Sequence, residues 1–255
     1  VESASDVLYH LDEDLSFKTV ADYEKYLREQ GIYREKAPKI AIVGGLNDPF
    51  SGNRANIDSL IVSLQKAGMN VYPVSSYRQR LAFLREIAPD AVIHFAHGRM
   101  VMGQADAAVE WLKKRNIPIF SPLSMLETQE EWESDPMGMF GGFMSQSIVV
   151  PELDGAIYPY VLNDQELDEE GIYLFKAIPE RLKNFTRIIG NFISLKRKPN
   201  AEKKVAIYYF KGAGQSSLTA QGLETVPSLY NLLKRLKAEG YTVKNLPATE
   251  KEFEK

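Results

Sequence analysis

The chain has 255 residues, of which 44% are hydrophobic, and its formal net charge is −3. This length allows one large or two modest cores, and the near-balanced charge gives no electrostatic footprint for nucleic acid or an anionic membrane. The chain contains no cysteine, which excludes a disulfide framework, a thiolate metal site and a cysteine nucleophile. No apolar run in the sequence approaches the roughly 20 residues that span a bilayer.

Apolar periodicity predicts strands that alternate with helices along the first half of the chain. An amphipathic helix over Val20 to Gln30 is expected in an N-terminal arm. Buried strands and intervening helices are then predicted, the strands at 39–45, 70–74, 91–96 and 117–121 and the helices at 57–67, 81–88 and 104–115. Alternation at this spacing indicates βαβ crossovers and a parallel sheet that is covered on both faces.

The second half is expected to start a further unit of the same kind. A strand at 156–162, an acidic loop at 164–170 and a long helix from Pro179 to Arg197 are predicted first. The predicted second unit has strands at 204–210 and 241–246 and a helix at 226–238. The predicted fold is therefore α/β, with two consecutive Rossmann-like or periplasmic-binding-like units of mostly parallel sheet, the second incomplete.

Four parts follow from this reading: an N-terminal helical arm at 1–37, a first α/β domain at 38–162, a connecting long helix at 163–202 and the start of a second α/β domain at 203–255. The chain begins at Val1 and ends in a charged stretch without a closing element, so we expect it to be an internal piece of a larger protein.

A sharp turn is predicted where an apolar segment meets the strand at 156–162. Pro151 removes a backbone donor and fixes φ, whereas Gly155 permits φ > 0. Glu152 and Asp154 lie inside this turn, between hydrophobic walls. They are either part of an ordinary capped turn or carboxylates that serve a site.

The predicted strand ends hold further candidates, because open parallel sheets bind ligands outside the carboxyl ends of their strands. The loop from Gly44 to Asn53 precedes a helix, and its amides can cradle an anionic group; otherwise it is a βα loop in which Asn53 or Ser51 caps the helix. It lacks the residues of a P-loop and of a dinucleotide fingerprint, which argues against ATP and NAD.

Two histidines occur at the end of the predicted strand 91–96. With a period of two they point to opposite faces, so they do not form a ready metal site. His94 is expected in the core, whereas His97, next to Gly98 and Arg99, is the better functional candidate. The loop that begins at Lys211 is another candidate; its two glycines alone are a poor signal, and the other interpretation is a structural turn.

Three segments, in order, resemble the tetrapyrrole-binding large subunits of the CobN/magnesium-chelatase H family. They are Gln146 to Gly155, with its Pro-Glu-Leu-Asp-Gly ending, Gly52 to Ile61, and Gly222 to Leu229 with the leucines that follow it. The resemblance runs from about Lys39 to Val243. It implies insertion of a divalent metal (cobalt, magnesium or iron) into a corrin or porphyrin, driven by ATP hydrolysis on separate partner subunits of the AAA+ type.

Within this resemblance the site residues take provisional roles. His97 and Glu152 are the expected catalytic groups, which accept pyrrole protons as the metal enters. Arg99, Asn53, Asp154 and Lys211 are the expected tetrapyrrole-binding residues, Arg99 by a bidentate contact to a propionate. We expect this piece to bind no cofactor itself and to lack a nucleotide site, and we expect a cytoplasmic parent that can associate with a membrane.

Two departures leave alternatives open. His97 and Arg99 replace the small polar residues that family members tend to carry at this strand end, and Glu224 stands where an aspartate is common. The first departure can mark a homologue that handles iron porphyrin, including removal of metal from haem. The other alternative is a two-lobed module that closes on a small ligand without catalysis.

Overall fold

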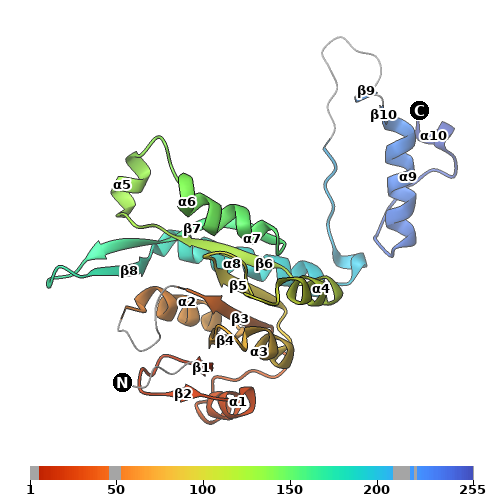
Figure 1. The fold of residues 1–255 in the computed structure, drawn as a ribbon. Coiled ribbons are helices and arrows are strands. Elements are labelled where there is room, and N and C mark those ends of the chain that lie inside the picture. The colour runs from red at the N-terminus through yellow and green to blue at the C-terminus, as the bar shows by residue number, and fades with distance from the viewer. Residues whose placement is uncertain (1–5, 46–52, 209–218, 221–222, 255) are drawn as a thin grey trace. The chain divides into compact units, whose positions relative to one another are not determined.

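The computed structural model describes residues 6–45, 53–208, 219–220 and 223–254. The chain forms two compact units, Val1–Ile193 and Ser194–Lys255. The first unit holds an eight-stranded sheet in the order β2-β1-β4-β3-β5-β6-β7-β8, and Figure 1 shows the helices that accompany it. These strands are β1 (Val7–Tyr9), β2 (Ser16–Phe17), β3 (Lys39–Gly44), β4 (Asn70–Ser75), β5 (Ala91–Phe95), β6 (Ile119–Ser124), β7 (Ala156–Leu167) and β8 (Tyr173–Ala177).

The five central strands, β4, β3, β5, β6 and β7, run parallel, which confirms the α/β prediction. The apolar runs of β3, β4 and β5 are continuous because both faces of the sheet are buried there, whereas Ile157 and Tyr158 at the start of β7 are exposed. On β3, Ala41 and Val43 belong to one core cluster, whereas Ile40 and Ile42 belong to the other. This alternation follows from the period-two geometry of a strand.

Helices cover both faces through apolar stripes at helical spacing. The cluster around Val43 includes side chains from α1 (Val20–Glu29), α3 (Arg80–Ile87) and α4 (Ala105–Arg115). The cluster around Ile42 includes side chains from α2 (Ala55–Lys66) and α8 (Pro179–Arg197). The predicted long helix is therefore confirmed, and it buries Phe185, Ile189 and Ile193 at helical spacing.

The predicted acidic loop at 164–170 is wrong for most of its length. Strand β7 continues to Leu167, because Asn163 to Leu167 pair antiparallel with the five residues of β8. The turn between the strands is centred on Asp168, whose carboxylate accepts from the amides of Glu170 and Ile172. Acidic residues are typical of loops, but here the backbone hydrogen bonds to β8 make residues 164–167 part of a strand.

The region at 128–144, for which no regular element was predicted, carries two short helices. Helix α5 (Gln129–Ser134) has a capping box in which Thr128 and Glu131 satisfy each other's backbone amides. Helix α6 (Gly141–Met144) runs into the π-helix η1 (Ser145–Val149), and α7 (Val150–Glu152) follows.

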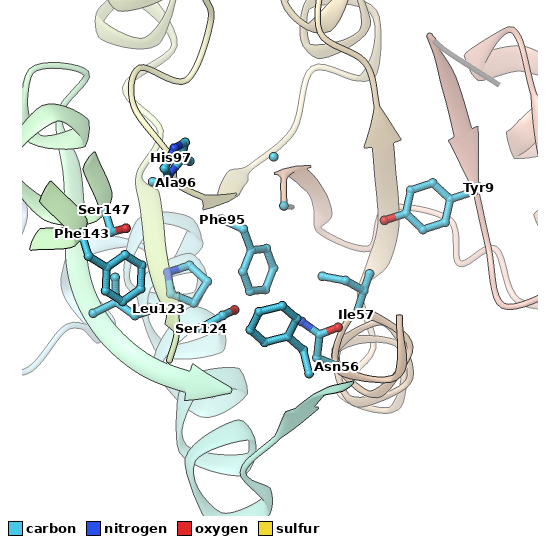
Figure 2. A pocket seen from close by; sticks show the side chains of 14 residues that line it. Tyr9, Asn56, Ile57, Phe95, Ala96, His97, Leu123, Ser124, Phe143 and Ser147 are labelled. Atoms are coloured by element: carbon cyan, nitrogen blue, oxygen red, sulfur yellow. The ribbon is translucent and has the colours of Figure 1, made fainter. Parts of the chain in front are cut away.

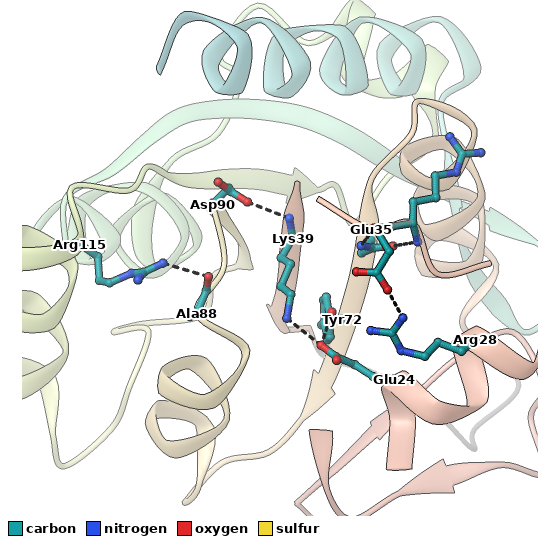
Figure 3. A network of polar contacts seen from close by, with 10 residues as sticks. Glu24, Arg28, Glu35, Lys39, Tyr72, Ala88, Asp90 and Arg115 are labelled. Carbon is teal, nitrogen blue, oxygen red and sulfur yellow. Dashed lines mark hydrogen bonds and ion pairs between the residues drawn. The ribbon is translucent and has the colours of Figure 1, made fainter. Parts of the chain in front are cut away.

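The N-terminal arm is not only helical, since β1 and β2 extend the sheet antiparallel next to β4. Helix α1 is tied to the sheet through Glu24, which accepts hydrogen bonds from the Lys39 Nζ and the Tyr72 hydroxyl, both at 2.7 Å (Figure 3). Burial opposes ionisation of Glu24, but these hydrogen bonds outweigh it and lower the pKa of the carboxyl group. Nearby, Arg28 pairs with Glu35 at the exposed surface.

The second unit contains the predicted helix but no second parallel sheet in its described residues. Helix α9 (Thr225–Ala238) confirms the helix at 226–238, and it is accompanied by η2 (Asn200–Glu202), β9 (Thr219–Ala220), β10 (Leu223–Glu224) and α10 (Glu250–Phe253). Residues 204–208 and 241–246 form no strand, which corrects both predictions, and positions 209–210 lie outside the described residues. A strand needs a neighbouring ladder for its backbone groups, and the described part of this unit offers these segments none.

The contact of α1 with the sheet gives a test. Glu24→Gln should lower the free energy of unfolding by about 1–3 kcal/mol at neutral pH, because it removes a charge-assisted acceptor for Lys39. Since the folded-state pKa of Glu24 is lowered, its contribution is present above the ordinary pKa of a glutamate and is lost as the pH falls through the folded-state value. The advantage of the wild type should therefore shrink in acid.

Urea titrations followed by the fluorescence of Trp111 and Trp132, both in the first unit, measure this difference. Glu35→Gln is the control, because an ion pair as exposed as Arg28–Glu35 contributes little to stability. Equal losses in the two variants, or a Glu24 effect that grows in acid, would contradict this account.

Candidate functional site

The strand order of the sheet reverses at β3. Strand β4, which follows β3 in the sequence, pairs with one side of β3, and the next strand, β5, pairs with the other side. In open α/β sheets such a reversal leaves a crevice outside the carboxyl ends of the two strands, where ligands bind. The crevice of this chain therefore lies beyond Gly44 and Phe95.

A cavity of about 50 Å³ occupies this position (Figure 2). Its lining comes from the ends of β3, β5 and β6, from the start of α2, and from β1, β8 and the segment of α6 and η1. The lining residues are Tyr9, Gly44, Gly45, Asn56, Ile57, Phe95, Ala96, His97, Pro122, Leu123, Ser124, Phe143, Ser147 and Phe175. Among the described residues, the lining carries no carboxylate, lysine or arginine.

Close packing fixes the strand ends at this cavity. Gly44 has φ of +73°, and a Cβ on it would lie 2.5 Å from the carbonyl oxygen of Phe95 and 2.9 Å from Cδ2 of His94. Only glycine fits there, so β3 and β5 approach each other closely beneath the crevice.

The start of α2 brings a polar group to the cavity. Asn56, in the first turn, is 4% exposed, and its Oδ1 atom has no hydrogen-bond partner among the described residues. The preceding Arg54 is also buried and donates to Asp58 and to the carbonyl of His10, with its guanidinium over the ring of Tyr9. Arg54 thus joins α2 to β1 and places Tyr9 at the cavity.

The two histidines differ as predicted in their burial. His94 is 2% exposed, and burial, aided by the positive charge of Arg80, lowers its pKa to about 3, so it is neutral across the physiological range. His97 is exposed and lines the cavity, on the side where Figure 2 also shows Ser147 and Phe143. His97 is therefore the imidazole at this strand end that lies at the cavity.

Arg99 is engaged by Asp154. Its Nε donates to Asp154 Oδ1 at 2.8 Å, and the amide of Met100 donates to Oδ2 at 2.6 Å. The Asp154 side chain is fully buried, whereas that of Arg99 is 25% exposed. The tetrapyrrole-binding roles predicted for both residues stay predictions; in this structure the two residues bind each other and join the loop after β5 to the turn after α7.

A second contact joins the same segments. The amide of Gly98 donates to the carbonyl of Gln146 in η1 at 2.8 Å. Gly155 has φ of +82°, which confirms that the turn after α7 uses the conformation predicted for it. The segment from Gln146 to Gly155 therefore fastens the loop that carries His97.

The remaining candidates lie away from the cavity lining. Glu152 is exposed, and its carbonyl accepts from the amide of Gly155. The Asn53 side chain donates to the carbonyl of Tyr173 and accepts from the amide of Phe175, so it holds β8 against the start of α2. Lys211 lies outside the described residues. The assigned roles of these three residues stay predictions.

Sequence reasoning missed Asn56 and Tyr9. Asn56 falls within the segment Gly52 to Ile61 that carried the family resemblance, and a polar residue in the first turn of a helix after a strand end is a usable signal. Tyr9 gives no such signal, because β1 reaches the cavity only by pairing with β4, more than sixty positions along the chain.

The fold is a doubly wound α/β domain with a cavity at the carboxyl ends of β3 and β5. The chain belongs to the CobN/magnesium chelatase family, whose model matches residues 1–255. It is 27% identical over 259 residues to the magnesium-chelatase H protein of Chlorobaculum parvum, an alignment that covers 94% of this chain and 20% of that protein. It is 27% identical over 144 residues to the aerobic cobaltochelatase protein CobN of Pseudomonas aeruginosa, an alignment that covers 53% and 12%.

A solved structure shows the same fold. The catalytic subunit of cobaltochelatase from Mycobacterium tuberculosis aligns with a TM-score of 0.66 and 24% identity, covering 85% of this chain and 19% of that one. The chain thus spans about a fifth or less of the length of these three proteins.

The described residues contain no group of three or more histidine, aspartate or glutamate side chains placed to hold a metal ion. None of their helices is long and apolar enough to cross a membrane.

The Arg99–Asp154 pair can be tested by stability. Arg99→Met should lower the free energy of unfolding by about 1–3 kcal/mol, because it leaves the buried carboxylate with the Met100 amide as its remaining described donor. Chemical denaturation followed by tryptophan fluorescence measures the loss. Arg78→Met, at an exposed position on the same unit, should stay within about 0.5 kcal/mol of the wild type. An unchanged stability in Arg99→Met would show that the pair does not hold the loop.

Proposed function

We propose that the full-length protein inserts a divalent metal ion into a tetrapyrrole, and that this chain forms one edge of the tetrapyrrole site. Membership of the CobN/magnesium chelatase family supports the reaction, since the relatives are a magnesium chelatase and a cobaltochelatase by name. The observation that carries the proposal is the placement of His97 at the crevice between β3 and β5. A cytoplasmic location is proposed from the family resemblance alone.

The size of the cavity limits how the macrocycle can lie. Ligand pockets for drug-sized molecules commonly measure about 300–1,000 Å³, whereas this cavity is about 50 Å³. The macrocycle therefore lies across the mouth of the crevice in this proposal, and the cavity takes no more than a peripheral group. The remaining walls come from other parts of the full-length protein.

Insertion of the metal releases the inner pyrrole protons, so the reaction needs a proton acceptor near the macrocycle. His97 is exposed at the mouth, whereas His94 is buried and protonates only near pH 3. We assign proton acceptance to His97 and keep Glu152, on the exposed turn that is fastened to the same loop, as the second candidate. The metal ion is a substrate here, and ATP hydrolysis is assigned to partner subunits of the AAA+ type.

The reverse reaction, removal of a metal from a tetrapyrrole, would use the same groups with proton donation in place of acceptance. A two-lobed module without catalysis has less support, since the described residues form one parallel sheet and not two.

The test uses the full-length protein with its ATPase partners. Absorbance spectroscopy measures binding of a free-base tetrapyrrole and the rate at which its metal complex forms. His97→Gln should lower the insertion rate about 100-fold or more, the usual range for loss of a general base, while the dissociation constant of the tetrapyrrole changes by less than about threefold.

Glu152→Gln is measured in parallel and decides between the two candidates. Loss of the rate in Glu152→Gln with a normal rate in His97→Gln would transfer the role to the glutamate. If the wild-type protein bound no tetrapyrrole, the proposal would be wrong. If it removed metal from a metallated tetrapyrrole and inserted none, the reaction would run in the reverse direction.

A further inference from the structure

We propose that the stretch around α5 and α6 forms a docking face for a basic amphipathic helix of a partner protein. The docking face consists of Leu126, just before α5, of Met137, just after it, and of Phe140 and Met144 at the two ends of α6 (Figure 1). The inference names a contact between proteins and does not depend on the proposed reaction.

The side chains of the docking face are unusually exposed for apolar residues. Met137 is 76% exposed, Phe140 71%, Leu126 58% and Met144 40%. Single exposed apolar residues are common, but a group of large ones marks an interaction surface. Methionine is especially frequent on surfaces that adapt to a partner, because its side chain is unbranched and polarizable. The composition of the face therefore indicates a protein partner.

The docking face is held in place by the inward side of the same segment. Its inward side chains pack against a small core cluster that includes Leu123 and Val161. The guanidinium of Arg181 also lies 4.9 Å from the ring centre of Trp132, on α5. The inward side chains are Trp132, Met139, Phe143 and Ile148. The outward residues are thus presented by an anchored segment, which lowers the conformational entropy lost when a partner binds.

The surroundings of the docking face are negatively charged. Residues 125–144 contain five acidic residues and no lysine, arginine or histidine, although the whole chain has a net charge of only −3. Glu130 and Glu133 line an open hollow of about 470 Å³ along α5, together with Gln129 and Ser134. Glu133 accepts a hydrogen bond from Gln129 at 2.7 Å, and neither glutamate forms an ion pair within the described residues. These two carboxylates are free to receive cationic side chains.

Apolar side chains beside carboxylates determine the kind of partner. An anionic membrane, a nucleic acid or a carboxylate-bearing small molecule would be repelled by this charge. A helix with an apolar stripe and flanking lysines or arginines matches both features, because its stripe covers the apolar side chains and its cations reach the glutamates. Charge complementarity therefore selects a basic amphipathic helix.

The docking face adjoins the crevice. Phe143, on α6, and Ser147, on η1, line the cavity, while Phe140 and Met144 of the same stretch point outward. A helix docked on the outward side would therefore contact the segment that forms one wall of the crevice.

The experiment measures, by fluorescence anisotropy, binding of the full-length protein to a fluorescein-labelled peptide of leucine and lysine in amphipathic helical order. Two comparison peptides carry the same residues in scrambled order, or glutamate in place of each lysine. The wild type should bind the amphipathic lysine peptide at least about tenfold more tightly than either comparison peptide. Equal binding of the amphipathic and scrambled lysine peptides, or no binding, would overturn the inference.

Variants locate the contact. Phe140→Ser should weaken binding at least about tenfold, the loss typical of an apolar anchor in an interface. Tyr77→Ser is the matched control and should bind as the wild type does, since Tyr77 is an aromatic residue that is 66% exposed in the same unit but outside the docking face. Glu130→Gln/Glu133→Gln should weaken binding at low ionic strength and much less in about 1 M salt, where exposed charges are screened.

Unchanged binding in Phe140→Ser, or an equal loss in Tyr77→Ser, would show that the peptide binds elsewhere and would overturn the assignment. Sedimentation of the protein without peptide tests a second copy as the occupant. A wild-type oligomer that dissociates in Phe140→Ser would overturn the proposal of a partner helix, whereas the same state in both proteins agrees with it. The absorbance assay for tetrapyrrole binding is separate, so failure here leaves the proposed function standing.

Discussion

The buried carboxylate of Asp154 is the constraint on which the site depends. A carboxylate that is removed from water has to be paired and hydrogen-bonded, and Asp154 meets this need with the Nε of Arg99 and the amide of Met100. Both partners belong to the loop after β5, more than fifty positions earlier in the chain. The interaction therefore sets the path of the loop that carries His97, and it couples the edge of the sheet to the turn at Gly155.

The π-helix η1 adds a second fastening between the same two segments. A π-helix is less favourable than an α-helix and occurs often at functional sites. Here it places the Gln146 carbonyl opposite the amide of Gly98 and directs Ser147 to the cavity. His97 and Ser147 thus reach one crevice from segments that are held together by three described hydrogen bonds.

The parallel sheet could be predicted because continuous apolar runs and helical stripes are local patterns, as for β3 and α8. The turn at Gly155 was also predictable, because a proline fixes its own φ and a glycine can adopt a positive φ. The hairpin of β7 and β8 was not, because acidic residues such as Glu166 belong to a ladder that only the partner strand reveals. The site depends on contacts between residues far apart in the sequence, and neither the Arg99–Asp154 pair nor the contact of Arg54 with Tyr9 can be read from the local sequence.

The central claim is that the loop held by Asp154 presents His97 to a tetrapyrrole at the carboxyl ends of β3 and β5. The most direct measurement is an experimental structure of the full-length protein with a free-base tetrapyrrole bound. The account predicts the macrocycle across the crevice, His97 facing its inner nitrogens, and Arg99 still bonded to Asp154. A macrocycle bound away from this edge, or Arg99 released from Asp154 to hold a propionate, would contradict it.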